Sequence, residues 1–296
     1  MHRAGWTIDV RTTTARGEAS NLARMAAAEG FGTVIACGGD GTLREVAEGL
    51  AGREGVAGRD AALAVLPAGT ANVWAREAGI PLDLAGALAL VVRGRRVRID
   101  TGLANGHRFL LMCSAGLDAT TVHALEGSRA KRWFGRVAYA AAGIRNAALT
   151  PAVATTIELC TEVEEPLRLE RDVLMAVVGN SRLFGLVARV TAEARVDDGL
   201  LDVCVLSAQA AGGHARGLSH RLGLAWTALR DGLPDAAARG RFGVDYGRAT
   251  RVRIDSDLPL DVQADGDWIG TTPLEITIEP ASLTVVVPWG PNPLWE

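Results

Sequence analysis

No stretch of the chain approaches the roughly 18 consecutive apolar residues that a membrane-spanning helix requires. The first residues also lack the apolar centre of a secretory signal peptide. Basic residues are not in excess, because 31 Lys and Arg are offset by 34 Asp and Glu, so no nucleic-acid partner is indicated. These absences predict a soluble, cytoplasmic protein that does not bind nucleic acid.

Cysteine is scarce, and its spacing does not suit a metal site. Cys37, Cys113, Cys160 and Cys204 are far apart and form no C-x-x-C pair, and the histidines show no ligand spacing either. Each cysteine lies in an apolar run of strand length. We therefore expect four buried thiols in a reducing compartment, with no disulfide and no zinc site.

The chain is long enough for two domains, with 296 residues. In its first part, short apolar runs alternate with helix-forming segments. Strands are expected at Thr33–Cys37 and Ala61–Leu66, and helices at Asn21–Glu29, Thr42–Leu50 and Ala71–Ala78. This alternation predicts a parallel sheet covered by helices on both faces, over residues 1–98.

Strand-like runs separated by Asn-Gly, Asp-Gly and Pro turns dominate the rest of the chain. Strands are expected at His107–Cys113, Thr155–Cys160, Val173–Val178, Leu200–Leu206, Arg251–Ile254, Leu274–Ile278 and Leu283–Val287, with helical insertions near Arg129–Ala148 and Gly217–Leu229. We therefore predict that residues 99–296 form a second domain, a β-sandwich.

Two loops of the first domain have the features of a phosphate site. Gly38-Gly39-Asp40-Gly41 joins an expected strand to an expected helix, and Thr42 with Glu45 forms a T-x-x-E capping box that would begin this helix. Backbone N–H groups at a helix start attract anions, and the missing side chains let a phosphate approach. Residues 66–72 (LPAGTAN) repeat the arrangement after the next strand. Two such loops at the carboxyl ends of parallel strands suit a triphosphate.

Asp40 places a carboxylate in the first of these loops, where it would repel phosphate. Mg²⁺ would resolve the conflict, because it binds carboxylate and phosphate oxygens together. The alternative is that Asp40 only serves the tight turn, as Asp often does. The flanking glycines and the capping box favour a functional Asp40.

Motifs along almost the whole chain resemble the diacylglycerol kinase catalytic-domain family, which includes bacterial lipid kinases and sphingosine kinases. The similar segments are GGDGT at Gly38–Thr42, G-T-x-N at Gly69–Asn72, D-T-G at Asp100–Gly102, FLLMCSAGLD at Phe109–Asp118, V-G-N-S at Val178–Ser181 with Gly185, ARVDDGLLD at Ala194–Asp202, D-G-D at Asp265–Asp267, P-L at Pro273–Leu274 and PASLTVVVP at Pro280–Pro288. They occur in the family's order.

The resemblance implies ATP-dependent phosphorylation of a lipid hydroxyl, on diacylglycerol or a sphingoid base, in a cleft between a nucleotide-binding α/β domain and a β-sandwich. It implies that ATP is bound by Thr13, Gly38, Gly39, Asp40, Gly41, Thr42, Leu43, Arg44, Glu45, Gly69, Thr70 and Asn72, with Mg²⁺ spanning the phosphates through Asp40. These residues would place ATP for transfer.

Two further sites follow from the resemblance. Asp265 would be the general base, with Asp267 where the family usually has Glu. A structural Mg²⁺ would be held by Asp198 and the backbone carbonyls of Arg195 and Leu200. Taken without the resemblance, the Asp-Gly pairs at both places indicate only tight turns.

The chain departs from the family pattern in two places. Val73 follows the second loop where the family often has Asp, which removes a carboxylate from the phosphate network. The family's opening strand and Asn-Pro-x-x-Gly loop are absent, and we expect a missing first strand to lower stability or activity. The alternatives are therefore a nucleotide- or lipid-binding pseudokinase, or an NAD-kinase-type activity, which shares GGDG but lacks the motifs of Asp265–Pro288.

Residues 129–139 (RAKRWFGRVAY) mix basic and aromatic side chains. On a helix they would contact an anionic membrane surface. In the alternative interpretation the helix is solvated and its aromatics pack into the core. Because the expected substrate is a membrane lipid, we expect peripheral contact with the inner membrane face; a homodimer is left open.

Overall fold

The computed structural model describes residues 5–51, 61–125, 150–163, 165–183, 189–208 and 243–295. Among these residues, none of the helices combines the length and apolar character that crossing a membrane demands. The chain divides into two compact units, one of Met1–Ile99 with Ala281–Glu296 and one of Asp100–Pro280. The division after Ile99 lies beside the expected boundary, but the C-terminal segment, which we had expected in the second domain, belongs to the first unit.

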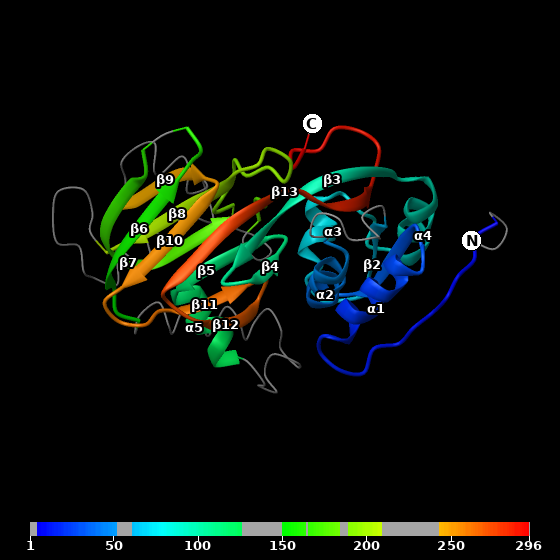
Figure 1. Ribbon diagram of the computed structural model, residues 1–296, viewed down its shortest axis with the longest axis horizontal. Coiled ribbons are helices and arrows are strands. Elements are labelled where there is room, and N and C mark those ends of the chain that lie inside the picture. Colours follow the sequence, from blue (N-terminus) through cyan, green and yellow to red (C-terminus); the bar gives the residue numbers. More distant parts are fainter. Residues whose placement is uncertain are drawn as a thin grey trace. The chain divides into compact units, whose positions relative to one another are not determined.

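The first unit is an α/β unit built on a small parallel sheet. It contains α1 (Glu18–Ala28), α2 (Asp40–Leu50), α3 (Val73–Glu77), α4 (Leu84–Arg93), β1 (Thr33–Gly38) and β2 (Ala62–Pro67), and it shares β3 (Arg95–Ala104) and β13 (Leu274–Val287) with the second unit (Figure 1). Strands β1 and β2 pair in parallel. Val285 of β13 then pairs in parallel with Leu63 of β2, which explains why the C-terminal segment joins this unit.

The sheet of the first unit is apolar on both faces. Ala62 and Ala64 of β2 pack with Val91 of α4. Leu63 and Val65 point to the opposite face, because side chains alternate along a strand, and they are buried as well. The predicted helix-covered parallel sheet is thus confirmed.

Helix α2 begins earlier than its predicted capping box. Gly39 is the N-cap residue, in an extended conformation, and no side chain caps the helix. The Leu43 N–H donates to the Gly39 carbonyl at 3.0 Å, which places Thr42 inside the first turn. The capping-box prediction is wrong, because the glycine run lets the chain enter the helix before Thr42. Asp40 supplies the negative charge that favours the first turn.

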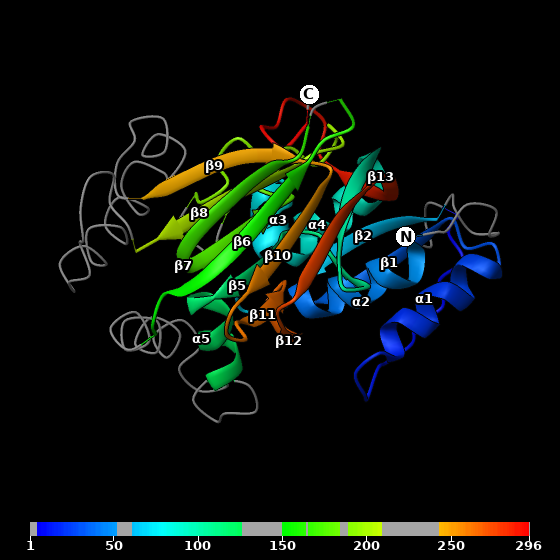
Figure 2. The same cartoon turned by 60° about the vertical axis from the view of Figure 1, so that its left-hand side comes forward.

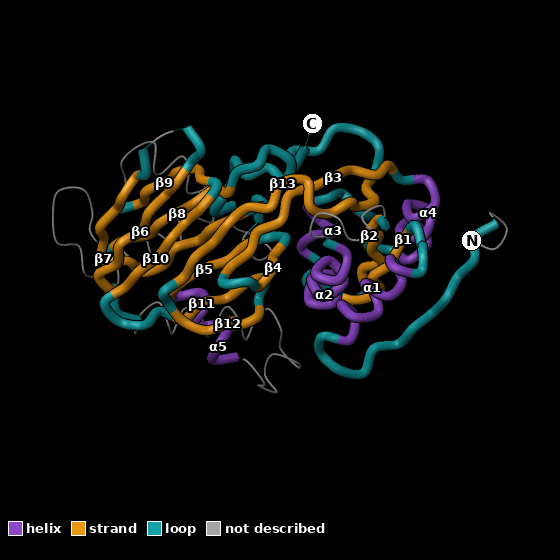
Figure 3. The backbone as a smooth tube through the Cα atoms, in the orientation of Figure 1, coloured by secondary structure: helices purple, strands orange, loops and turns teal. Residues whose placement is uncertain are grey.

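The second unit consists mainly of antiparallel strands (Figure 3). It contains β4 (His107–Phe109), β5 (Met112–Gly116), α5 (Leu117–Leu125), β6 (Val153–Cys160), β7 (Leu167–Gly179), β8 (Leu201–Ser207), β9 (Val244–Ala249), β10 (Arg251–Ser256), β11 (Asp261–Ala264) and β12 (Asp267–Thr271). The strand order is β10-β6-β7-β5-β11-β12, and β8 pairs with both β7 and β9 (Figure 2). The expected strands at 274–278 and 283–287 are parts of the single strand β13.

The core of the second unit follows from alternation along its strands. Strand β6 buries Val153, Ile157 and Leu159 on one face, and these pack with Val252 and Ile254 of β10 in one apolar cluster. This alternation is typical of the strands of the predicted β-sandwich class. The two helical insertions expected near 129–148 and 217–229 lie outside the described residues.

The cysteines differ in exposure, against our expectation of four buried thiols. Cys113 and Cys204 are buried, Cys160 is half-buried and Cys37 is exposed. Cys37 is exposed because it lies near the carboxyl end of β1, next to the loop that leaves the sheet. Burial raises the pKa of the Cys113 and Cys204 thiols, which keeps them protonated and unreactive.

We therefore expect a neutral thiol reagent to label Cys37 within minutes in the folded protein and to leave Cys113 and Cys204 unlabelled until the protein is denatured. Peptide mapping after a timed quench measures this order. Rapid labelling of Cys113 in the folded protein would contradict the packing of β5.

Candidate active site

The two glycine loops of the first unit touch backbone to backbone. A Cβ atom added to Gly69 would lie 2.4 Å from the Cα of Gly39, closer than carbon atoms approach without a bond. The Ala68 N–H also donates to the Gly38 carbonyl at 2.9 Å. Glycine is required at position 69 because any side chain would separate the loops. The sequence predicted both loops, and the structure brings them together.

Asn72 and Asp40 hold the second loop in shape. The Asn72 side chain accepts a hydrogen bond from the Gly69 N–H at 3.0 Å and donates one to the Gly69 carbonyl at 2.9 Å. The Asp40 carboxylate accepts hydrogen bonds from the N–H groups of Val73 at 3.1 Å and Trp74 at 3.2 Å, at the start of α3. Asp40 therefore connects the two loops through backbone donors, and the apolar side chain of Val73 does not disturb this link.

The remaining predicted nucleotide residues lie around these loops. Nothing lies within 4 Å of a Cβ built on Gly41, so the first turn of α2 is open on the side of Gly41. Leu43 is buried in the core and would reach a nucleotide only through its backbone. Thr13 and Thr70 are exposed, Thr13 in the extended segment before α1. Arg44 and Glu45 lie in α2. A loop pair with open space at a helix start fits a polyphosphate.

Asp265 lies at the tip of the β11–β12 hairpin in the second unit. Asp265 and Gly266 both have positive φ, 49° and 85°, between the paired residues Ala264 and Asp267, which makes a two-residue hairpin turn. The turn predicted from the Asp-Gly pair is confirmed. Its position beside β5 follows from antiparallel pairing of Ala264 with Cys113.

The Asp265 carboxylate is anchored by three backbone donors. The N–H groups of Leu110, Leu111 and Met112 donate to it at 2.7, 3.0 and 3.0 Å. On the other side of the same segment, the buried Asn180 side chain donates to the carbonyl of Leu110 at 3.0 Å. Hydrogen bonds to a carboxylate stabilise its ionised form. Asp265 therefore fixes the segment between β4 and β5.

A buried polar cluster fixes the same turn from inside the sheet. The Gly266 N–H donates to the side-chain oxygen of Gln263 at 2.7 Å. The Gln263 amide nitrogen in turn donates to Ser114 Oγ at 2.9 Å and to Asp118 Oδ2 at 3.1 Å. The sequence interpretation missed this role of Gln263, although a polar residue alternating with apolar ones in β11 was a visible signal.

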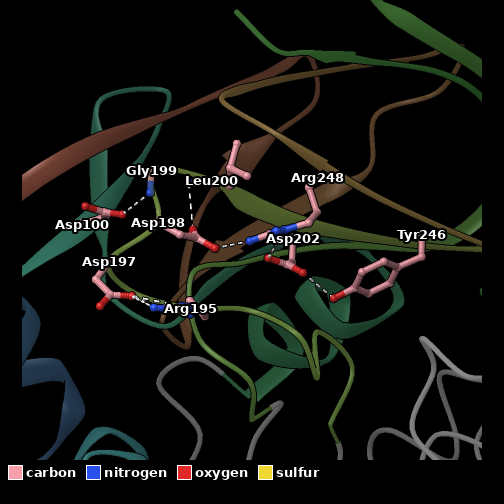
Figure 4. A network of polar contacts seen from close by, with 9 residues as sticks. All are labelled: Asp100, Arg195, Asp197, Asp198, Gly199, Leu200, Asp202, Tyr246 and Arg248. Atoms are coloured by element: carbon pink, nitrogen blue, oxygen red, sulfur yellow. Dashed lines mark hydrogen bonds and ion pairs between the residues drawn. The ribbon is translucent and has the colours of Figure 1, made fainter. Parts of the chain in front are cut away.

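The loop before β8 carries the predicted metal site (Figure 4). Asp198 Oδ1 accepts the Leu200 N–H at 3.1 Å, and Oδ2 contacts the guanidinium of Arg248. Arg195 pairs with Asp197 at 3.2 Å. The described residues contain no group of three or more His, Cys, Asp or Glu side chains that could hold a metal ion. The carboxylate expected to hold the structural Mg²⁺ thus already contacts a cationic side chain.

Asp202 lies next to this loop and has no exposed side-chain surface. Its carboxylate accepts a hydrogen bond from the Tyr246 hydroxyl at 2.6 Å and lies 3.5 Å from Arg248 Nε. Burial raises the pKa of Asp202 to about 6, although Tyr246 and Arg248 act in the opposite direction. The sequence interpretation missed Tyr246 and Arg248, because only the pairing of β8 with β9 places them here.

Comparison with known proteins agrees with this geometry. Residues 1–104 match the model of the diacylglycerol kinase catalytic domain, and residues 111–222 match that of the YegS C-terminal NAD kinase beta sandwich-like domain. A solved diacylglycerol kinase from Bacillus anthracis str. Sterne has the same fold, with a TM-score of 0.66 at 20% identity over 93% of this chain and 83% of that chain.

Curated relatives extend the match over the whole chain. A protein named "Probable lipid kinase YegS-like" from Pseudomonas aeruginosa is 35% identical over 98% of this chain and 88% of its own length. One of the same name from Pseudomonas putida is 35% identical over 98% of this chain and 88% of its own length. The resemblance found in the motifs is confirmed. The chain therefore belongs to the family of YegS-like proteins with a diacylglycerol kinase catalytic domain.

Proposed function

We propose that this protein is a lipid kinase that transfers the γ-phosphate of MgATP to the hydroxyl group of a membrane lipid, diacylglycerol or a sphingoid base. The observation that carries the proposal is the contact between the two glycine loops at Gly39 and Gly69, with open space beside Gly41 in the first turn of α2. The names of the curated relatives support the same chemistry. Phosphoryl transfer depends mainly on placement and on neutralising charge, which backbone donors supply.

The first unit would hold the nucleotide. The N-terminal turn of α2 has uncapped N–H groups, and they attract the phosphates together with the helix dipole. The Asp40 carboxylate accepts hydrogen bonds from the start of α3, so in this proposal it fixes the second loop. It would contact the Mg²⁺ of MgATP through water. Thr13 and Thr70 are the exposed hydroxyl groups offered to ATP.

The turn Asp265–Asp267 of the second unit would hold the acceptor hydroxyl. Asp265 was expected to be the general base. Both of its carboxylate oxygens already accept backbone hydrogen bonds. We therefore assign proton acceptance to Asp267 and the shaping of the site to Asp265. The acceptor lies in a bilayer, so the proposal includes peripheral membrane contact; the segment 129–139 expected to make it lies outside the described residues.

Transfer from γ-labelled ATP in the presence of Mg²⁺ tests the proposed function. Diacylglycerol, sphingosine, ceramide and phosphatidylglycerol are supplied in separate mixed micelles, and NAD in a separate tube. We expect label in one of the lipids and none in NAD. Label in NAD alone would support the NAD-kinase alternative. A folded protein that binds ATP but labels no acceptor would support the pseudokinase alternative.

A further inference from the structure

We propose that the side chain of Arg248 provides the positive charge that stabilises the loop around Asp198, and that this loop keeps its structure without a bound metal ion. The predicted alternative is a Mg²⁺ held by Asp198 and the carbonyls of Arg195 and Leu200. The inference concerns the stability of the second unit and does not depend on the proposed function.

The position of Arg248 is fixed by strand pairing. Arg248 of β9 lies directly opposite Asp202 of β8 in the antiparallel ladder, and Tyr246 lies opposite Cys204. Since side chains alternate along a strand, Tyr246 and Arg248 project from the same face of β9. Both reach Asp202 on the neighbouring strand, as Figure 4 shows. The sheet therefore fixes the backbone of Arg248 beside Asp202, independently of the Asp198 loop.

From this position Arg248 reaches two carboxylates. Its Nη2 contacts Asp198 Oδ2, and its Nε lies 3.5 Å from Asp202 Oδ2. The side chain of Arg248 is 38% exposed, whereas those of Asp198 and Asp202 are 19% and 0% exposed. Two partly or fully buried carboxylates so close together need a cation between them, and Arg248 supplies it.

The rest of the loop is also braced by protein groups. Gly199 has a positive φ of 72°, and its N–H donates to Asp100 Oδ2 at 2.7 Å. Asp100, which lies in β3, is joined to the loop a second time, since its N–H donates to the Val196 carbonyl at 2.6 Å. With both oxygens of Asp198 and one of Asp100 engaged, the loop has a defined shape. A divalent ion at Asp198 would have to displace the guanidinium or lie against it, and like charges repel.

Thermal unfolding of the nucleotide-free protein tests the inference, in EDTA and in millimolar MgCl₂. For the wild type we expect the same Tm in both buffers. For Arg248→Met we expect a Tm lower by roughly 4–8 °C in EDTA, because two buried carboxylates lose their cation. Part of this loss should return in MgCl₂, which can bind the vacated carboxylates.

Arg253→Met is the matched control, since Arg253 forms an exposed pair with Asp255 at 2.8 Å on β10. We expect its Tm to equal that of the wild type in both buffers, because exposed ion pairs contribute little. A wild-type Tm that falls in EDTA and recovers in MgCl₂ would overturn the inference. So would an Arg248→Met variant as stable as the control. If Arg248→Met does not fold, the wild-type comparison and the charge-conserving Arg248→Lys decide the question.

Discussion

Substitution of Gly69 by alanine is expected to weaken ATP binding by about 5- to 140-fold, because overpacking typically costs about 1–3 kcal/mol and about 1.4 kcal/mol corresponds to a factor of ten. The new Cβ would lie 2.4 Å from the Cα of Gly39 and 2.8 Å from the side-chain oxygen of Asn72. The first of these neighbours is backbone and cannot rotate away. The two loops must therefore separate, which moves apart the backbone amides that we propose for phosphate binding.

Titration calorimetry with MgATP measures this loss, and thermal unfolding shows whether the variant is still folded. Gly32→Ala is the matched control. A Cβ at Gly32 would meet only the Arg96 guanidinium at 3.7 Å, an ordinary contact, and Gly32 lies outside the loops. We expect the control to bind ATP as the wild type does. Equal ATP affinity of Gly69→Ala and Gly32→Ala would show that the loop contact is not needed for nucleotide binding.

Substitution of Asp265 by asparagine is expected to lower both stability and lipid phosphorylation, and Asp267→Asn is expected to lower phosphorylation. Asparagine has a single acceptor oxygen, so its NH₂ group would face at least one of the three N–H groups of residues 110–112. A buried donor left without an acceptor costs about 1–3 kcal/mol. Loss of a proton acceptor at Asp267 should reduce kcat by about 10²–10⁴-fold.

The same two variants separate the roles of the two carboxylates. Unfolding midpoints in urea report the stability of each variant, and initial rates with the labelled lipid report kcat and KM. If the Asp267→Asn variant has the wild-type kcat, the proton acceptor is Asp265 and not Asp267. A stable Asp265→Asn variant would show that the three amide hydrogen bonds do not hold the segment between β4 and β5.

Local features of the sequence predicted much of the fold. The Asp-Gly pair at 265–266 predicted a hairpin turn, and the two glycine loops predicted where strands give way to helices in the first unit. The start of α2 was predicted wrongly because a helix can begin at any of several residues in a run of glycines. The hydrogen bond from the Leu43 N–H to the Gly39 carbonyl shows which start the structure adopts. Such choices depend on backbone geometry and not on side-chain pattern.

Contacts between residues far apart in the chain could not be predicted from the local sequence pattern. The carboxylate of Asp265 meets amides more than 150 residues earlier in the chain, and backbone amides have no sequence signature. Arg248 reaches Asp202 only because of the register of β8 and β9. The family resemblance predicted functional roles for Asp198 and Asp265. The residues that contact them could be identified only from the tertiary structure.

The sharing of β13 between the two units has a consequence for the order in which the protein can fold during synthesis. The first unit includes Ala281–Glu296, and Leu63 of β2 finds its partner Val285 in that segment. The ribosome releases this segment after the whole of the second unit. Domains are often complete as soon as their own stretch of chain has emerged, N-terminal ones first. Here the first unit begins before the second and is completed after it, so its sheet must wait with an open edge while the whole second unit is translated.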